Sequence, residues 1–355
     1  ASIGVVSYID RDYWPLNTCL FATDFHGNNP RYVYYFLQTL DLAAHNSGSA
    51  QPSLNRNYIA PIQIRVPTRA IQDDIVALIG SLDDKIELNR QMNETLEAMA
   101  QAIFRDWFVD FGPTRRKVDG ASDPVEVMGG LVTDAERAQQ LADLFPERFG
   151  DNGLPGGWRI GEIGDIVSNV VERCKPSAAT QALPYVPIDT IDAHKLVLSQ
   201  WRPGEEAQSS LVRFKSNDIL FGAMRPYFHK VAVSAFDGVT RTTVFVLRPK
   251  LQADLYFAAS QINEPSSIEY ATLHSSGSTI PYAVWPNSFE KLPAALPPPG
   301  VRHKYGELVT QYFSLMNLNE AQNRVLSSTR DLLLPKLMSG EIRLQEADEV
   351  LEAAQ

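Results

Sequence analysis

Residues 66–111 decide the fold of this chain, and they read VPTRAIQDDIVALIGSLDDKIELNRQMNETLEAMAQAIFRDWFVDF. Apolar side chains recur in this stretch at steps of three, four or simple multiples, which is typical of one face of an α-helix. They are Ile71, Ile75, Leu78, Leu82, Ile86, Leu96, Met99, Ile103 and Trp107. Thr68 is placed to cap the first turn, and Gly112-Pro113 is placed to end the helix. The stretch predicts one helix of about 60 Å, and because its apolar stripe is narrow, the helix needs a partner helix.

The partner helix is predicted in the same chain, because the sequence repeats itself. A shift of 230 positions matches Pro67 with Pro297, Leu78 with Leu308, Asn89 with Asn319, Asn93 with Asn323 and Ile103 with Leu333. The loop His45–Ser49 also lies 229 positions before the loop His274–Ser278. We therefore expect two repeats, each a globular segment followed by a long helix. The helices should pack antiparallel, with Leu78, Leu82, Leu96 and Ile103 facing Leu308, Tyr312, Leu326 and Leu333.

The repeat divides the chain into six parts. They are a globular segment 1–66, the first long helix 67–111, a connector 112–155, a second globular segment 156–298, the second long helix 299–344 and an acidic tail 345–355. Because Ala1 aligns near residue 227, the first segment has no counterpart of about seventy residues of the second. We interpret the chain as beginning inside a domain.

The local patterns predict an α+β fold. Strand-like runs are found at Ile3–Ile9, Thr18–Thr23, Tyr185–Asp189, Ile219–Phe221, Lys230–Ser234 and Thr242–Leu247, and helical patterns at 31–40, 133–145 and 255–263. The connector is rich in Gly, Pro and charge, so we expect an exposed link. Pro335 is expected to kink or end the second helix and Gly340 to close it, with a frayed tail after Arg343.

Composition limits the possible functions. The net charge is −10, but segments 1–66 and 156–298 are each neutral, so the excess acid lies on the helices, connector and tail. Either globular segment can present a basic face, although tight DNA binding by this chain alone is not expected. The six His and two Cys show no metal-ligand spacing, no apolar run is long enough for a membrane span, and no signal peptide is visible. Cys19 and Cys174 suggest reduced thiols in a cytoplasm.

Several long, idiosyncratic stretches carry a resemblance to a known family. They are IRVPTRAIQDDIVALIGSLDDKIELN (64–89), AIFRDWFVDFGP (102–113), LFPERFGDNGLPGGW (144–158), FKSNDILFGAMRPYFHKVAV (214–233) and LLLPKLMSGEI (332–342). By these motifs, their order and the tandem repeat, the whole chain resembles the specificity (S) subunit of type I restriction-modification enzymes. The front of the first domain and Ile71-Gln72, where the family usually has an acidic residue and Gln, depart from the pattern.

The resemblance implies a fold and a function. The fold would be two tandem target-recognition domains, the first incomplete at its N-terminus, separated by two long conserved helices that form an antiparallel coiled coil. Each domain would read half of a split sequence in double-stranded DNA. Two methyltransferase subunits would dock on this scaffold, holding the S-adenosylmethionine with which they methylate adenine N6, and ATP-dependent restriction subunits would join them. No cofactor is expected in this chain.

The sequence lacks the motifs of the enzyme classes that we considered. The sequence has no (Asp/Asn)-Pro-Pro-(Tyr/Phe) motif, no Gly-rich phosphate loop and no Gly-x-Ser-x-Gly elbow. Asp83-Asp84-Lys85 echoes a nuclease motif, but a charge cluster in mid-helix is the better interpretation. A second hypothesis is a truncated scaffold that assembles with methyltransferase, or with itself, without reading DNA.

Candidate DNA contacts lie in the loops. The first group, in GAMRPYFHK, is Arg225, Tyr227, His229 and Lys230; the second is Thr240, Arg241 and Thr242; the third is the paired loops, with Ser275, Ser276, Gly277, Ser278, Asn46 and Ser47, followed by Arg56. Arg173, Lys175, His194 and Lys195 are weaker candidates. Cations can reach phosphate or guanine edges, and Gly/Ser loops can bring backbone N–H groups to phosphate. A structural turn is an equal alternative for Arg225 and the better one for the paired loops.

Overall fold

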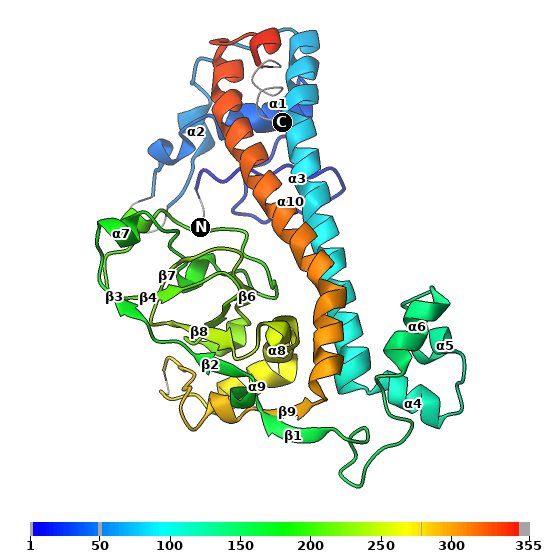
Figure 1. Cartoon of the computed structure of the whole chain (residues 1–355). Coiled ribbons are helices and arrows are strands. Elements are labelled where there is room, and N and C mark those ends of the chain that lie inside the picture. The colour runs from blue at the N-terminus through cyan, green and yellow to red at the C-terminus, as the bar shows by residue number, and fades with distance from the viewer. Residues whose placement is uncertain (1–2, 49–51, 278, 348–355) are drawn as a thin grey trace. The chain divides into compact units, whose positions relative to one another are not determined.

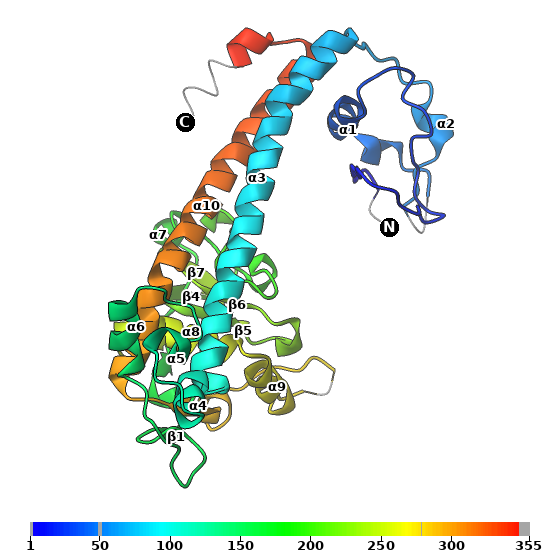
Figure 2. The same ribbon diagram turned by 90° about the vertical axis from the view of Figure 1, so that its right-hand side faces the viewer.

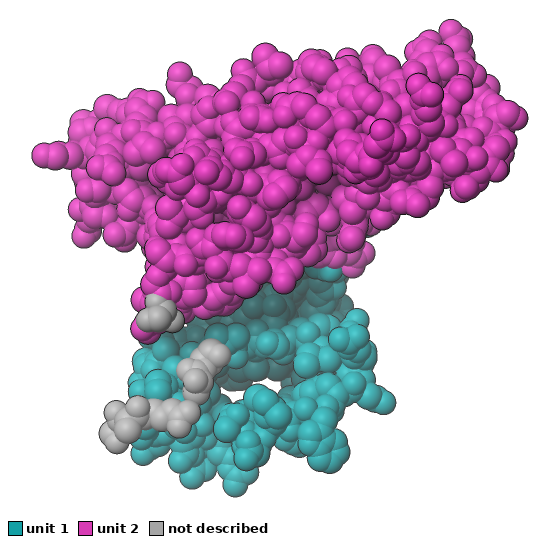
Figure 3. Space-filling model, turned by 90° about the horizontal axis from the view of Figure 1, so that it is seen from below, with its two compact units in different colours: residues 1–90, 321–355 teal, residues 91–320 magenta. Residues whose placement is uncertain are grey.

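The computed structural model describes residues 3–48, 52–277 and 279–347. The chain forms two compact units, which Figure 3 colours separately. Unit 1 comprises residues 1–90 and 321–355, and unit 2 comprises residues 91–320. The long helices α3 and α10 each contribute residues to both units, and the units are described separately below.

The two long helices are α3 (Arg69–Phe104) and α10 (Pro299–Ser339). The first continues as one π-helical turn, Arg105–Val109. Pro335 lies inside α10, so of the two expectations, a kink or an end, the end is wrong, whereas Gly340 follows the helix at φ +73° as expected. In exposed surroundings near the C-terminal end of α10, the missing N–H of Pro335 is tolerated.

Within each unit the α3 and α10 segments lie side by side and antiparallel (Figures 1 and 2). In unit 1, Arg330 Nη1 donates to Asp83 Oδ1 at 2.7 Å and Asn89 Nδ2 to Asn323 Oδ1 at 2.9 Å. In unit 2, Asn319 Nδ2 donates to Asn93 Oδ1 at 2.8 Å, and the Tyr305 hydroxyl to the Ala100 carbonyl at 3.2 Å. Within each unit, residues later in α3 pair with residues earlier in α10, as an antiparallel arrangement requires.

The expected apolar seam is partly correct. Of its eight residues, Leu82, Ile103, Leu308 and Leu333 are buried, and Leu78, Leu96, Tyr312 and Leu326 are half-buried. Ile71 and Met99, which were assigned to the stripe, are exposed. The positions between the apolar ends are filled by buried polar side chains, Asn89, Asn93, Glu97, Asn319, Glu320 and Asn323. The seam therefore has apolar ends and a polar middle.

Outside the long helices, unit 1 contains α1 (Pro30–Gln38) and α2 (Arg56–Ile59). Tyr32 and Tyr35 of α1 pack with Ile75, Ile79 and Leu333. The runs Ile3–Ile9 and Thr18–Thr23 form no strand in the described residues, so those expectations are wrong. Their side chains are largely exposed, and no neighbouring strand offers them backbone partners.

Unit 2 carries all the strands of the described residues. They are β1 (Arg159–Glu162), β2 (Val167–Asn169), β3 (Arg173–Cys174), β4 (Leu211–Phe214), β5 (Ile219–Gly222), β6 (Val231–Val233), β7 (Gly238–Arg241), β8 (Val244–Pro249) and β9 (Pro293–Leu296). They form antiparallel sheets in the orders β1-β9, β2-β8-β5-β6 and β3-β4-β7. The helices are α7 (Ala178–Gln181), α8 (Leu255–Asn263) and α9 (Pro265–Leu273).

Three of the expected strands overlap β5, β6 and β8, and the expected helix 255–263 is α8. The expected strand Tyr185–Asp189 is wrong: Tyr185 makes isolated bridges, and Ile188–Thr190 forms a 3₁₀ turn. Pro184 and Pro187 each lack an N–H donor, which disfavours a ladder there.

The connector is folded, so its interpretation as an exposed link is wrong. It forms α4 (Gly112–Val118), α5 (Pro124–Val127) and α6 (Ala135–Ala142). Met128 and Ala138 are fully buried in one cluster with Trp107 and Trp158. Short amphipathic helices thus cover the end of α3 in unit 2. Most of the predicted tail lies outside the described residues.

Together these elements confirm an α+β fold with an antiparallel pair of long helices. None of the helices in the described ranges combines the length and apolarity needed to cross a bilayer.

Candidate nucleic-acid interface

Three of the candidate loops meet at one edge of unit 2. The Arg225 N–H donates to the Pro281 carbonyl at 2.7 Å. Ser276 and Tyr282 exchange two backbone hydrogen bonds of 2.9 and 2.8 Å. The Tyr282 hydroxyl donates to the Thr242 carbonyl. The loop after β5, the loop after β7 and the Ser-Gly loop after α9 are thus tied together through Pro281 and Tyr282.

The tip of the loop after β5 is held in an uncommon conformation. Arg225 and His229 have φ values of 52° and 54° and flank the 3₁₀ turn Pro226–Phe228. For residues other than Gly this left-handed conformation costs about 1–2 kcal/mol each, so the surrounding contacts must maintain it. The turn leaves Tyr227 and Phe228 49% and 48% exposed, with ring centroids 4.9 Å apart.

Besides Tyr227, five candidates remain accessible at this edge. Arg241, Thr242, Ser276 and Gly277 are exposed, and Arg225 is half-buried. Cations, hydroxyls, backbone N–H groups and two aromatic rings are the groups that proteins use toward phosphates, sugars and base edges. We name this set, together with Tyr227 and Phe228, the recognition edge.

Two other candidates in the loop after β5 have internal partners. His229 is buried, and its Nε2 lies 2.8 Å from the Asn263 carbonyl oxygen and 2.9 Å from Asn263 Oδ1. Burial, followed by the neighbouring His194, lowers the pKa of His229. Lys230 Nζ donates to the carbonyls of Ile188 and Ile191. We therefore remove His229 and Lys230 from the expected DNA contacts.

Thr240 is removed for the same reason, because it is fully buried and its hydroxyl donates to the Val186 carbonyl at 2.6 Å. Ser275 is half-buried and donates to the Ala271 carbonyl at 2.7 Å, which caps α9. Ser278 lies outside the described residues.

The weaker candidates divide between two places. Arg173 and Lys175 are exposed at β3, which pairs with β4, and β4 pairs with β7, so Arg173 and Arg241 lie on the two outer strands of one sheet. Lys195 is half-buried, with Nζ 3.9 Å from Asp192. His194 is exposed, and its ring centroid lies 4.3 Å from that of His229.

In unit 1 the corresponding loop is a turn. Asn46 Oδ1 accepts from the N–H groups of Gly48 and Ser53, each at 3.0 Å, and the Ser47 hydroxyl donates to the Ser53 carbonyl. These contacts favour the structural interpretation of Asn46 and Ser47. Arg56 is exposed at the start of α2 and stays a candidate.

Two residues of the nuclease-like triplet, Asp83 and Asp84, belong to an ion-pair network within unit 1. Asp83 accepts from the Tyr35 hydroxyl at 2.6 Å and from Arg330 at 2.7 Å, while Asp84 accepts from Arg31 at 2.7 Å. These carboxylates join α1 and α10 to α3. The sequence interpretation, a solvated charge cluster in mid-helix, is correct for Asp84, which is 68% exposed, but it missed that both carboxylates are paired.

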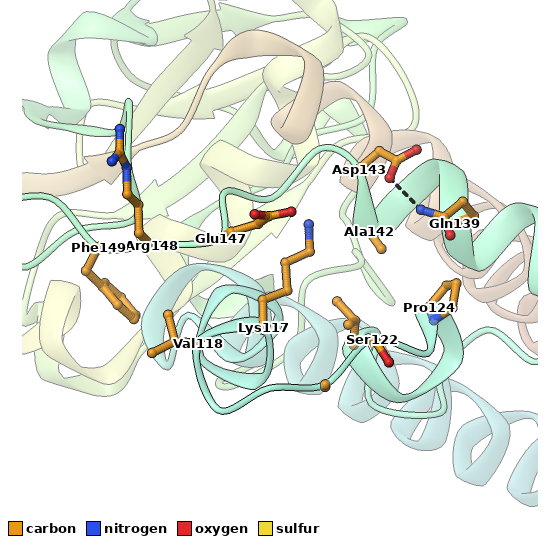
Figure 4. A pocket seen from close by; sticks show the side chains of 12 residues that line it. Lys117, Val118, Ser122, Pro124, Gln139, Ala142, Asp143, Glu147, Arg148 and Phe149 are labelled. Atoms are coloured by element: carbon orange, nitrogen blue, oxygen red, sulfur yellow. Dashed lines mark hydrogen bonds between the residues drawn. The ribbon is translucent and has the colours of Figure 1, made fainter.

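A hollow of about 690 Å³ lies in the connector of unit 2 (Figure 4). It is lined by cations and anions alike, among them Lys117, Arg148, Asp143 and Glu147. Lys117 Nζ already donates to the Phe145 carbonyl at 2.7 Å. The lining therefore favours neither an anionic nor a cationic ligand. In the described ranges, no three His, Cys, Asp or Glu side chains are grouped to hold a metal ion.

Sequence reasoning missed Phe228 and Tyr282. Phe228 could have been found because it adjoins Tyr227 in a loop that also carries Arg225. Tyr282 gave no local signal, since its role depends on the Thr242 carbonyl forty residues earlier in the chain.

Comparisons with known proteins give one consistent kind of relative. Residues 1–98 match the model of the "Type I restriction modification DNA specificity domain" family. The chain is 25% identical to the type I restriction enzyme HindI specificity subunit of Haemophilus influenzae, covering 85% of this chain and 73% of that protein. It is 24% identical to the MjaIX specificity subunit of Methanocaldococcus jannaschii, covering 89% and 69%.

A solved structure supports the fold. The S subunit of a type I restriction-modification system from M. genitalium aligns with a TM-score of 0.50 and 12% identity, covering 89% of this chain and 74% of that one. Over most of its length the chain is thus similar to proteins named type I restriction enzyme specificity subunits, and its residues 1–98 match the model of a type I restriction modification DNA specificity domain.

Proposed function

We propose that this chain selects the DNA target of a type I restriction-modification complex by reading one half-site of a bipartite sequence with the recognition edge. The hydrogen bonds that join Arg225 to Pro281, and Thr242 and Ser276 to Tyr282, carry this proposal. Three loops joined by hydrogen bonds present a cation, hydroxyls and aromatic rings on one surface. Such a combination can position phosphates and read base edges together.

The long helices provide the second element of the proposal. At 1.5 Å per residue, the 36 residues of α3 span about 54 Å. Two half-sites of one DNA molecule need reading modules held apart by something stiff. We propose that the α3–α10 pair is this spacer and that two methyltransferase subunits dock on it, with restriction subunits joining the complex.

Charge explains why the partners are needed. The segment 156–298 is neutral and the chain carries −10 overall, whereas DNA affinity depends largely on neutralising phosphates. We propose that the partner subunits supply most of the non-specific affinity and bind S-adenosylmethionine, while this chain supplies selectivity and no catalysis. Its thiols Cys19 and Cys174 are unbridged, as is usual in the cytoplasm, where we expect the complex to act.

The test uses the full chain assembled with its methyltransferase subunits. Mapping methylated adenines in DNA first gives the target. Duplexes with single mismatches in one half-site should then bind more weakly by about 1–3 kcal/mol per mismatch. Assembly without any sequence preference would contradict the proposal and favour the scaffold hypothesis, and methylation or cleavage by the purified chain alone would contradict its non-catalytic role.

Arg225→Ala sharpens the test within the recognition edge. If its guanidinium reads a base, binding should weaken by about 1–3 kcal/mol with lost preference at one position. If it contacts phosphate, affinity should fall for all sequences alike and the salt dependence should decrease. Lys230→Met is the matched control, because Lys230 is a cation of the same loop whose ammonium group donates to carbonyls within the chain. An Arg225→Ala complex that binds every duplex as the wild type does would remove Arg225 from the interface.

A further inference from the structure

A buried carboxylate joins α3 to the segment that carries the recognition edge. Glu97 is only 7% exposed. Its Oε1 accepts from the Leu196 backbone N–H at 3.0 Å and from Gln101 Nε2 at 3.2 Å. Both partners belong to unit 2, as Glu97 does. The Leu196 bond links α3 to a residue about one hundred positions later in the chain.

The peptide groups of Leu196 lead from Glu97 toward the recognition edge. The Leu196 carbonyl accepts from the Val233 N–H of β6 at 2.8 Å, and Val197 bridges to the same residue. The loop that holds Arg225 and Tyr227 runs from β5 to β6. One residue is therefore bonded to α3 through its N–H and, through its carbonyl, to β6, the strand that follows that loop.

Additional contacts connect the Leu196 segment with the same loop. The His194 N–H donates to the His229 carbonyl at 2.9 Å, and Lys230 Nζ donates to the Ile191 carbonyl at 2.7 Å. His229 and Lys230, which make these bonds, lie two and three residues after Tyr227 at the tip of the loop. A displacement of the Leu196 segment would therefore shift the loop.

The surroundings explain why Glu97 is an unusual choice for this position. Burial raises the pKa of Glu97 to about 7, opposed by the bonds from Leu196 and Gln101 and by the charge of Lys195. Lys195 is itself 3.9 Å from Asp192. An apolar residue at this position would avoid the cost of desolvating a carboxyl group. The hydrogen bonds that Glu97 Oε1 accepts must therefore offset that cost.

The other charged or titratable groups nearby lie on three elements. His194 and His229 lie on the adjoining loops, Glu94 is exposed on α3, and Glu320 of α10 is buried, accepting from Asn93 at 2.8 Å. Asn93 is one turn from Glu97, so the polar middle of the seam continues into this contact.

We propose that Glu97 is a positioning residue that holds the segment 156–298 on α3 through Leu196, and so sets how sharply the recognition edge discriminates its half-site. This inference rests on the proposed function. The contact requires an acceptor oxygen on a side chain as long as that of Glu, so that it reaches the Leu196 N–H. It does not require a negative charge.

The experiment compares substitutions that separate reach from charge, in the full chain assembled with methyltransferase subunits. Glu97→Gln keeps the reach and removes the charge, whereas Glu97→Asp keeps the charge and shortens the reach. Glu94→Gln is the matched control on the exposed face of the same helix. The measured quantity is the affinity ratio between matched and mismatched duplexes, taken separately in each half-site, together with hydrogen exchange of the Leu196 amide.

We expect Glu97→Gln and Glu94→Gln to retain the wild-type ratio in both half-sites. Glu97→Asp should lower the ratio about five- to tenfold in one half-site, corresponding to the loss of one hydrogen bond. The other half-site should not change, and exchange of the Leu196 amide should accelerate. Glu97→Met, which fills the space without an acceptor, should reproduce the Asp result and takes its place if the Asp variant does not assemble.

Three results would overturn the inference. The first is an affinity ratio that neither Glu97→Asp nor Glu97→Met changes. The second is an equal loss of the ratio in both half-sites. The third is a Glu97→Gln variant whose ratio falls as far as that of Glu97→Asp. The wild-type ratio is measured first, because a wild-type complex without discrimination in either half-site overturns the proposed function itself, whereas the three results above refute only the role of Glu97.

Discussion

The two units attach their smaller elements to the long helices in different ways. In unit 1, α1 packs Tyr32 and Tyr35 into an apolar cluster. In addition, ion pairs and hydrogen bonds among Arg31, Tyr35, Asp83, Asp84 and Arg330 join α1 and α10 to α3. In unit 2 the corresponding contact is an aromatic cluster. Its members are Phe104, Trp107, Phe108, Phe257 and Tyr305, all fully or almost fully buried, with ring centroids 4.9 to 6.2 Å apart.

This difference separates two sources of stability. The burial of large rings gives a strong, non-directional contribution that salt hardly changes. Partly exposed ion pairs contribute less, and salt weakens them. Unit 1 also leaves large apolar side chains exposed in residues 3–48, with Trp14 at 92%. We therefore expect the globular part of unit 1 to open more readily than that of unit 2.

The largest expected effect tests the aromatic attachment. Phe257 of α8 is fully buried against Phe104 and Phe108. Phe257→Ala should lower the free energy of unfolding of unit 2 by about 3–5 kcal/mol, because it removes the ring and leaves a cavity. Urea unfolding followed by tryptophan fluorescence measures this. The half-exposed Phe228→Ala is the control, and a Phe257→Ala loss below that of Phe228→Ala would show that the cluster is not what holds unit 2 together.

The second prediction concerns the carboxylate within the unit 2 attachment. The pKa of Glu97, raised by burial to about 7, exceeds its ordinary value of 4.5. The native state therefore holds the proton longer than the unfolded chain, so stability is full below pH 4.5 and falls as pH rises through 7. Glu97→Gln removes this loss, and relative to wild type it should gain up to about 3 kcal/mol in unfolding free energy between pH 5 and pH 8. Urea melts at both pH values measure the difference; an equal effect at both would show that Glu97 is not buried in its neutral form.

The fate of these residues shows what the sequence could and could not predict. The spacing of Ile75 and Ile103 was enough to locate α3, because helical periodicity is a local property. The polar middle of the seam was not foreseen, since Asn89 and Asn93 interrupt the apolar period and only the facing helix explains them. Their role became clear only from their hydrogen bonds to residues of α10, more than 200 positions later in the chain.

The candidate site divides in the same way. The stretch from Gly222 to Lys230 was correctly recognised as a loop, because its Gly and Pro are typical of a turn, whereas its contact with DNA stays a prediction. Its sequence could not tell Arg225 from Lys230, although the first has an accessible side chain and the second donates to carbonyls of Ile188 and Ile191. Which cation is used internally depends on contacts about forty residues away. The Glu97–Leu196 bond was hidden for the same reason.

The third prediction tests the polar attachment of unit 1. Asp83→Ala removes the acceptor of both the Tyr35 hydroxyl and Arg330. Because the Asp83 and Arg330 side chains are only partly buried, we expect unit 1 to lose about 1–2 kcal/mol. The loss should shrink at 1 M salt, as measured by hydrogen exchange of the α1 amides. Asp74→Ala, at an exposed position of the same helix, is the control. A salt-independent loss would assign the attachment of α1 to its apolar contacts instead.

The smallest effect is expected in the polar seam, where the two units again differ. In unit 1, Asn89 Nδ2 donates to Asn323 and Gln322, but Asn89 Oδ1 and Asn323 Nδ2 have no partner among the described residues. Replacing Asn89 and Asn323 together by Leu removes these unsatisfied atoms along with the bonds. The unfolding free energy should therefore change by less than about 1 kcal/mol, in either direction.

The equivalent pair in unit 2 is better satisfied and should be more sensitive. Asn93 accepts from Asn319 and donates to the buried Glu320 at 2.8 Å. Replacing Asn93 and Asn319 by Leu would leave Glu320 buried without this donor, which should cost about 1–3 kcal/mol. Urea unfolding of both double variants gives the comparison directly. If the Asn89/Asn323 variant proved the less stable of the two, the satisfied bonds of the seam would not decide its stability, and a change in helix register would have to be sought by crosslinking α3 to α10.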